Sequence, residues 1–362
     1  LNQITKGNWD VAKLLGVYES TVYYSSTEDN SIERVIYSVS LNGKNKKAIS
    51  PKNGFNGASF TSNYKYFIHT FEDSNTPLVY SLRESKTGEL VRRIMDNNEL
   101  LKKLEPYNLS RKDFSQINLN GQDLNMWMIK PTNFNPKKKY PVLIYQYSGP
   151  GSQEVENRWN NNRDFWHQLL AQKGYIIVCV DVRGTGFKGK KFKKVTYGQL
   201  AKYETEDQIS FAKYLSKLPY IDKNRIGIWG WSYGGLISTN SILKGNDVFS
   251  LAIAVAPVTN WRFYDTIYTE RFMGLPKNNS DGYDLNSPLN FAHLLEGDYL
   301  LIHGSADDNV HLQNTMRMVE ELIQQDKQFE WMIYPDKNHG IYGGNTSIHL
   351  YNKMTNFIEK KL

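Results

Sequence analysis

The 362-residue chain contains a single cysteine, and its apolar runs fall short of the roughly 18 to 20 residues that a transmembrane helix needs. One cysteine cannot form an intrachain disulfide, which excludes the small disulfide-stapled folds. Cys179 lies in the apolar run 175–180, so we expect a buried structural thiol. Residues 1–6 show no signal-peptide pattern and do not begin with Met. We therefore expect the chain to be part of a longer protein.

The sequence also lacks the H-E-x-x-H pattern of zinc hydrolases, and the acidic pair Asp307-Asp308 is not followed by the regular ligand spacing of a calcium loop. We expect no metal and no cofactor. The net charge of +7 comes from lysines that are scattered along the chain rather than aligned in a basic stripe with interleaved aromatics. This distribution predicts a solvated surface and no nucleic-acid partner.

Residues 1–104 predict short strands separated by turns. The strands are expected at 21–26, 34–39, 65–70 and 78–82. Segment 22–29 resembles 66–73, and 35–38 resembles 78–81, which gives a repeat of about 44 residues. Strand repeats of this length are typical of β-propeller blades, and an unrelated small sandwich is the alternative. Two blades cannot close a propeller, so we expect the other blades to lie outside this chain.

Residues 105–362 predict a second domain in which strands alternate with helices, the pattern of an α/β fold with a mostly parallel sheet. Continuous apolar runs of this kind are typical of strands buried on both faces. The strands are expected at 142–146, 176–180, 225–229, 251–255, 299–303 and 330–334. The helices are expected at 203–218, 235–243, 313–325 and 347–362.

The pentapeptide Gly230-Trp-Ser-Tyr-Gly234 stands between a predicted strand and a predicted helix. This context is what a G-x-S-x-G nucleophile elbow requires, because small residues let the serine sit on a tight strand-to-helix turn. Ser232 is therefore the candidate nucleophile. The helix that follows adds a field favourable to an anion.

A serine hydroxyl needs a base to remove its proton and an acid to orient that base, and in this kind of fold the chain order is Ser, Asp, His. Asp307 and His339 follow the strands 299–303 and 330–334, and complete that series. Asp308 competes with Asp307, and we expect it to face the loop or cap the next helix. The competing histidines are expected to have core or surface roles: His303, His311 and His349.

The motifs resemble the prolyl oligopeptidase family of serine peptidases, and most closely its dipeptidyl peptidase IV branch. The resemblance spans essentially the whole chain and rests on segments 4–7, 230–235, 268–271, 273–276 and 306–311. It implies an α/β-hydrolase domain preceded by about two blades of a truncated eight-bladed β-propeller. It also implies that Ser232, Asp307 and His339 form a catalytic triad, and it favours an exported or periplasmic bacterial protein.

The resemblance further implies an oxyanion hole made by the Tyr147 hydroxyl and the Tyr233 backbone amide. Without the resemblance, a buried sheet aromatic is the favoured interpretation of Tyr147. The family's proline pocket corresponds here to a largely aromatic set without an acid: Tyr233, Val258, Trp261, Tyr264, Tyr268 and Val310. Segment 261–272 is expected to be loop-like. Asn309 resembles the asparagine that holds the carbonyl of the preceding substrate residue.

The implied activity is release of N-terminal dipeptides with proline or alanine in second position, from a peptide with a free N-terminus. The double-glutamate motif that grips this N-terminus in the family does not occur in the chain; Glu204 and Glu206 belong to a hydrolase-domain helix, and are expected to be surface or structural. A tripeptidyl peptidase, an acylaminoacyl-type peptidase or esterase, and a catalytically silent binding module remain as alternatives. Phe272 stands where close relatives have tyrosine. The resemblance also implies a homodimer for the intact protein.

Overall fold

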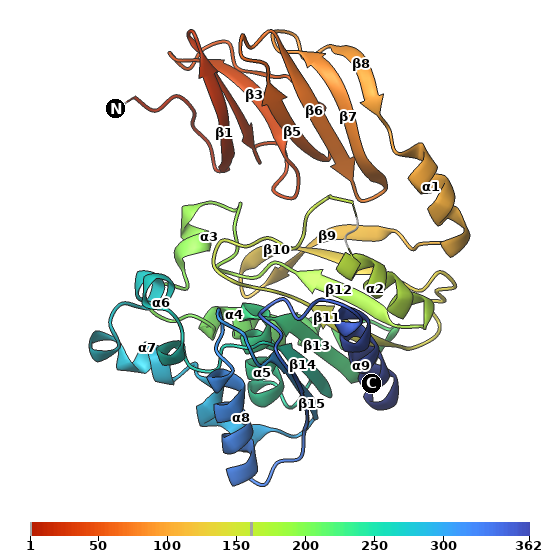
Figure 1. Ribbon diagram of the computed structural model, residues 1–362, viewed down its shortest axis with the longest axis vertical. Helices are drawn as coiled ribbons and strands as arrows, with labels where there is room; N and C mark the ends of the chain where they lie inside the picture. The colour runs from red at the N-terminus through yellow and green to blue at the C-terminus, as the bar shows by residue number, and fades with distance from the viewer. Residues whose placement is uncertain (1, 160–161) are drawn as a thin grey trace. The chain divides into compact units, whose positions relative to one another are not determined.

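The computed structural model of the protein describes residues 2–159 and 162–362 (Figure 1). The chain divides into two compact units. Unit 1 comprises Leu1–Lys112, Val155–Gln168 and Gly186–Lys190, and unit 2 comprises Asp113–Glu154, Leu169–Thr185 and Lys191–Leu362. The domain boundary expected after residue 104 stays a prediction.

Unit 1 contains two four-stranded antiparallel sheets, with strand orders β1-β2-β3-β4 and β5-β6-β7-β8. The strands are β1 (Val11–Tyr18), β2 (Thr21–Ser26), β3 (Val35–Ser40), β4 (Lys47–Ala48), β5 (Phe55–Phe60), β6 (Tyr66–Asp73), β7 (Thr76–Glu84) and β8 (Leu90–Met95). The sequence repeat falls on equivalent strands, because β2 matches β6 and β3 matches β7. The expected two blade-like sheets are thus confirmed; the sequence reading had missed β1, β4, β5 and β8.

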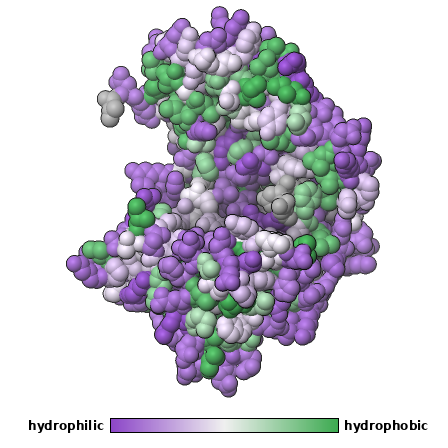
Figure 2. All heavy atoms as spheres, in the orientation of Figure 1, coloured by the Kyte–Doolittle hydropathy of each residue, from purple (hydrophilic) through white to green (hydrophobic). Residues whose placement is uncertain are grey.

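The two sheets of unit 1 share a hydrophobic core. Strands β2 and β3 are buried on both faces, so that Tyr23 and Ile36 pack with Phe67 of β6, while Tyr24 and Val35 belong to a cluster on the opposite face. Large apolar side chains stay exposed on β1 and β8, and Figure 2 shows hydrophobic patches on unit 1. Exposed apolar strands of this kind are typical of surfaces that pack against another protein surface.

Unit 2 is built on an eight-stranded sheet with the order β16-β15-β14-β13-β11-β12-β10-β9. The strands are β9 (Lys112–Leu119), β10 (Gln122–Ile129), β11 (Tyr140–Tyr145), β12 (Ile176–Val180), β13 (Ile221–Trp231), β14 (Leu251–Val255), β15 (Asp298–Gly304) and β16 (Glu330–Tyr334). From β12 to β16 along this order the pairs are parallel, and β10 pairs antiparallel with β12. The predicted mostly parallel sheet is confirmed.

Strands β9 and β10 were missed by the sequence reading. They follow one another through Asn120 and Gly121, which have φ angles of 52° and 73°. Asn-Gly between two strands is the strongest short-range hairpin signal, because both residues tolerate positive φ at little cost. The signal was therefore present in the sequence.

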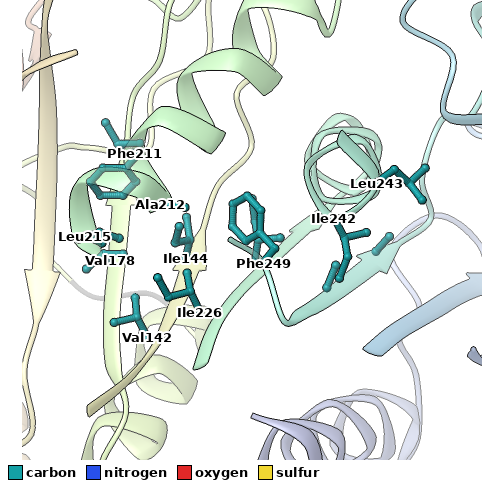
Figure 3. Close-up of a cluster of buried hydrophobic side chains, with 14 of the residues drawn as sticks. Val142, Ile144, Val178, Phe211, Ala212, Leu215, Ile226, Ile242, Leu243 and Phe249 are labelled. Atoms are coloured by element: carbon teal, nitrogen blue, oxygen red, sulfur yellow. The ribbon is translucent and has the colours of Figure 1, made fainter. Parts of the chain in front are cut away.

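Helices pack on the sheet of unit 2, and the expected ones are confirmed within a few residues. Phe211, Ala212 and Leu215 of helix α4 lie against Val178 and other strand residues in the main core (Figure 3). None of the described helices is long and apolar enough to cross a membrane. The α-helices within the described residues are α1 (Asn98–Leu104), α2 (Asn162–Gln172), α3 (Lys190–Lys194), α4 (Lys202–Leu215), α5 (Tyr233–Lys244), α6 (Thr266–Met273), α7 (Ser280–Asp284), α8 (Gln313–Gln324) and α9 (Thr346–Lys361).

The packing of the central strands predicts a large cost for a cavity there. Leu301 on β15 is 0% exposed, so Leu301→Ala is expected to lower the free energy of unfolding by about 2–5 kcal/mol. Leu285 is 63% exposed, and Leu285→Ala is expected to change it by less than about 0.5 kcal/mol. Urea unfolding of the two variants measures the difference; equal effects would contradict the assignment of β15 to the core.

Candidate active site

Ser232 occupies the turn between β13 and α5. Its φ and ψ angles of 60° and −115° are sparsely populated for a residue with a side chain, and its amide donates to the Val255 carbonyl at 2.8 Å. The flanking glycines make this turn sterically feasible. A Cβ on Gly230 would lie 2.5 Å from the Gly234 backbone, and a Cβ on Gly234 would lie 2.5 Å from the Gln146 carbonyl oxygen. The serine is partly exposed, as a nucleophile must be.

Asp307 lies in the loop after β15 and is 5% exposed. Its Oδ1 accepts hydrogen bonds from the Asn309 and Val310 amides at 3.0 and 2.9 Å, and its Oδ2 lies 2.7 Å from His339 Nδ1. Burial alone would raise the pKa of Asp307, but hydrogen bonds from His303 and His339 hold that pKa well below its ordinary value. The carboxylate is therefore ionised at neutral pH and orients the imidazole.

His339 follows β16 and its side chain is 24% exposed. Two backbone bonds join its loop to the Asp307 loop, from Ser305 N to Tyr334 O at 2.9 Å and from Ala306 N to Lys337 O at 3.0 Å. The loop is also tied to the nucleophile elbow, because the indole of Trp231 donates to the His339 carbonyl at 3.0 Å. These contacts hold the backbone of the His339 loop against the Asp307 loop and the end of β13.

The competing acid and histidines take other positions. Asp308 and His311 are exposed, and His349 on α9 shares a 2.8 Å hydrogen bond with the Tyr334 hydroxyl. His303 is fully buried, as expected of a core residue, but its Nε2 lies 3.2 Å from Asp307 Oδ2. Sequence reasoning missed this contact. No local pattern indicated it, because the contact forms only when the loop after β15 folds back toward the strand end.

Tyr147 follows β11, between Gln146 and Ser148. Burial raises the pKa of its phenol, and the neighbouring Ser232 side chain acts to lower that pKa. A neutral hydroxyl at this point is a donor that faces the serine oxygen. Its role in an oxyanion hole stays a prediction.

An aromatic cluster surrounds the elbow. Trp261 is its centre, with ring centroids 5.6 Å from Tyr233, 5.8 Å from Tyr264 and 5.9 Å from Tyr268. Val258 and Val310 are buried in the same cluster. All the predicted pocket residues are thus brought together. The segment is not loop-like as expected, because a 3-10 helix at Trp261–Phe263 and helix α6 hold these rings.

The cluster also orients Asn309. The Tyr264 hydroxyl donates to Asn309 Oδ1 at 2.7 Å, so the side-chain oxygen of Asn309 is already hydrogen-bonded. The Asn309 NH₂ group is then the end of the amide that can donate to a carbonyl oxygen.

Residues 161–362 match the family model described as "Prolyl oligopeptidase family". The chain belongs to this family. Residues 1–78 match a second model, "Dipeptidyl peptidase IV (DPP IV) N-terminal region". This match covers strands β1 to β6 and the start of β7. The predicted membership of the prolyl oligopeptidase family, near its dipeptidyl peptidase IV branch, is confirmed.

Among solved structures, dipeptidyl peptidase 4 from Porphyromonas gingivalis is 47% identical with a TM-score of 0.97, covering 100% of this chain and 51% of that protein. "Probable dipeptidyl-aminopeptidase B" from Phaeosphaeria nodorum is 38% identical over 97% of this chain and 39% of its own length. A protein of the same name from Sclerotinia sclerotiorum is 37% identical over 98% of this chain and 39% of its own length. The chain spans about half or less of each relative.

Gly304 allows the Asp307 and His339 loops to approach, because a Cβ there would overlap the carbonyl oxygen of Lys337. Gly304→Ala is therefore expected to lower the free energy of unfolding by about 1–3 kcal/mol. Gly340→Ala, in the His339 loop, is the control, because its Cβ would meet the movable side chain of Tyr342 at 2.8 Å. Urea unfolding measures both; a Gly304 variant as stable as the control would refute the close approach.

Proposed function

We propose that the chain forms the catalytic part of a serine dipeptidyl peptidase that releases N-terminal dipeptides with proline or alanine in second position. The observation that carries the proposal is the Asp307–His339 hydrogen bond of 2.7 Å beside the strained Ser232 elbow. Family membership and the relatives named as dipeptidyl peptidases support it. The substrate is a peptide with a free N-terminus.

In the proposed mechanism, Ser232 Oγ attacks the carbonyl carbon of the second substrate residue while His339 Nε2 takes the hydroxyl proton. His339 then gives this proton to the leaving amine, and an acyl-enzyme forms. Water then attacks the acyl-enzyme while His339 takes a proton from it. His339 returns this proton to Ser232 Oγ, and the dipeptide acid is released. Asp307 stays ionised and stabilises the imidazolium, in keeping with its lowered pKa.

The Tyr147 hydroxyl and the Tyr233 amide serve as oxyanion donors in this proposal. Tyr233 is the first residue of α5, and the first amides of a helix have no partner within the helix. A donor aimed at the developing oxyanion in a buried site typically lowers the activation free energy by about 2.7–4 kcal/mol. Tyr147 is held beside Ser232, where that charge develops.

The aromatic cluster is proposed to bind the proline ring. Proline presents a rigid apolar ring without an amide proton, so aromatic faces can hold it by burial alone. The NH₂ of Asn309 is suited to bind the carbonyl of the first substrate residue. The proposal assigns no residue of this chain to bind the free amine of the substrate. A prolyl tripeptidyl peptidase is therefore the second candidate. A homodimer stays a prediction from the resemblance.

The activity is tested in the intact protein with Gly-Pro and Ala-Pro p-nitroanilides, an N-acetylated peptide and a simple p-nitrophenyl ester. Rapid hydrolysis of the two dipeptide amides alone is expected, because these substrates combine proline with a free amine. Ser232→Ala should abolish both turnover and covalent labelling by a fluorophosphonate. Preference for the ester or the acetylated peptide would refute the proposal in favour of those activities, and unchanged labelling would refute the nucleophile.

Tyr147→Phe separates the oxyanion role from a packing role. Loss of one donor is expected to lower kcat by about 100- to 1000-fold with little change in KM, because the oxyanion exists only after attack. Steady-state kinetics with Ala-Pro p-nitroanilide measures both constants. A wild-type kcat in this variant would mean that the hydroxyl does not act on the oxyanion.

A further inference from the structure

Helix α4 presents two fully buried polar side chains, Glu204 and Gln208, to the elements that carry the oxyanion donors. Residues four apart lie on the same face of a helix. Glu204 Oε1 accepts a hydrogen bond from the Tyr233 hydroxyl at 2.6 Å, and the same hydroxyl oxygen accepts from the Ala201 amide at 3.2 Å. Glu204 is thus attached to the residue whose amide is the proposed oxyanion donor.

Gln208 is attached to the segment around the second donor. Its Nε2 donates to Ser148 Oγ at 3.2 Å, and Ser148 Oγ donates to Gln146 Oε1 at 2.9 Å. Gln146 Nε2 in turn donates to the Gly234 carbonyl at 2.7 Å. Tyr147 therefore stands between two residues that are both anchored, one of them to the nucleophile helix α5.

Two oxygens on this face of α4 have no hydrogen-bond partner within the described residues: Glu204 Oε2 and Gln208 Oε1. An ionised carboxylate and an amide oxygen are both acceptors only, so they cannot pair with each other. A proton on Glu204 Oε2 changes this, because the resulting O–H can donate to the amide oxygen one turn along the helix. One proton would satisfy both buried atoms, each of which is costly to leave unpaired.

The surroundings of Glu204 favour that proton. The titratable groups that act on its carboxyl are Tyr233 on α5, Tyr268 on α6 and Asp207 on α4 itself. None of these three is a cation, and Arg183 is bound to Asp207 at 2.7 Å. Burial raises the pKa of Glu204 to about 8, against the Tyr233 hydroxyl and the backbone amides of Glu204 and Ala201, which act to lower it.

We propose that Glu204 is a positioning residue that acts in its neutral form, donating from Oε2 to Gln208 and accepting from Tyr233 at Oε1. One face of α4 then sets the positions of both oxyanion donors through a single chain of hydrogen bonds. This inference rests on the proposed function. It assigns a purpose to a buried acid that neither touches the substrate nor exchanges protons with it.

The ionisation of Glu204 has a defined consequence for catalysis. Above about pH 8 the carboxylate forms, its link to Gln208 is lost, and an uncompensated charge remains behind Tyr233. We expect kcat of the wild-type protein to fall over this range. Glu204→Gln should retain most of kcat and lack this fall, because an amide is the uncharged analogue of the acid and donates and accepts at the same positions.

Glu204→Leu replaces the carboxyl group by an apolar side chain of similar size and so removes both hydrogen bonds. It is expected to lower kcat by about 10- to 100-fold with a smaller change in KM, as for a group whose effect is felt when the oxyanion forms. Glu206→Gln is the matched control, because Glu206 is exposed on the same helix, and its pH profile should equal that of the wild type. An alkaline fall that persists in Glu204→Gln, or a wild-type kcat in Glu204→Leu, would overturn the proposal.

A measurement independent of activity separates this proposal from the function on which it rests. The infrared spectrum near pH 6 should contain a protonated carboxylic acid band that Glu204→Gln lacks. The unfolded chain ionises this group near 4.5 and the folded chain near 8, so the wild type should lose thermal stability relative to Glu204→Gln as pH rises between these values.

The outcomes are distinct. If neither the infrared band nor the pH-dependent difference in Tm appears, Glu204 is ionised and the inference is wrong, even if the peptidase activity is found. If both appear in a protein that does not cleave dipeptide amides, the proposed function fails and the purpose assigned to Glu204 fails with it. Should Glu204→Leu not fold, the pH profile of Glu204→Gln decides alone.

Discussion

The parallel register of β13, β15 and β16 is the constraint on which the site depends. Carboxyl ends of parallel strands meet at one edge of a sheet, so residues that are far apart in sequence leave the sheet side by side. Ser232, Asp307 and His339 each follow one of these strands directly or by a short loop. The 2.7 Å contact between Asp307 and His339 is a consequence of this register together with the backbone bonds that join their loops.

Close backbone approach is the second requirement, and it explains several glycines at once. Gly230 and Gly234 let the elbow pass against β11, and Gly304 lets the histidine loop lie on the acid loop. The same closeness brings Tyr147 to Ser232. A side chain at any of these positions would move two loops apart and would separate donors that the proposed chemistry needs within hydrogen-bond distance.

Behind the candidate site residues, unit 2 contains a network of buried polar groups. His303 lies against Asp307, and the chain from Gln208 through Ser148 to Gln146 supports Tyr147. Buried polar networks have defined geometry because each unpaired member is costly. Such a network suits a site whose electrostatic contribution depends on donors that do not move during the reaction.

The sequence by itself determined the fold class, the strand repeat of unit 1 and the candidates Ser232, Asp307 and His339, because these follow from local periodicity, glycine spacing and the order of motifs along the chain. It also contains the Asn120-Gly121 pair, which marks the hairpin of β9 and β10. Only the tertiary structure decided that Glu204 is buried rather than exposed, that His303 contacts Asp307 and that the 261–272 segment is helical. These properties depend on how the elements pack and how the loops fold back, which a local sequence pattern does not show.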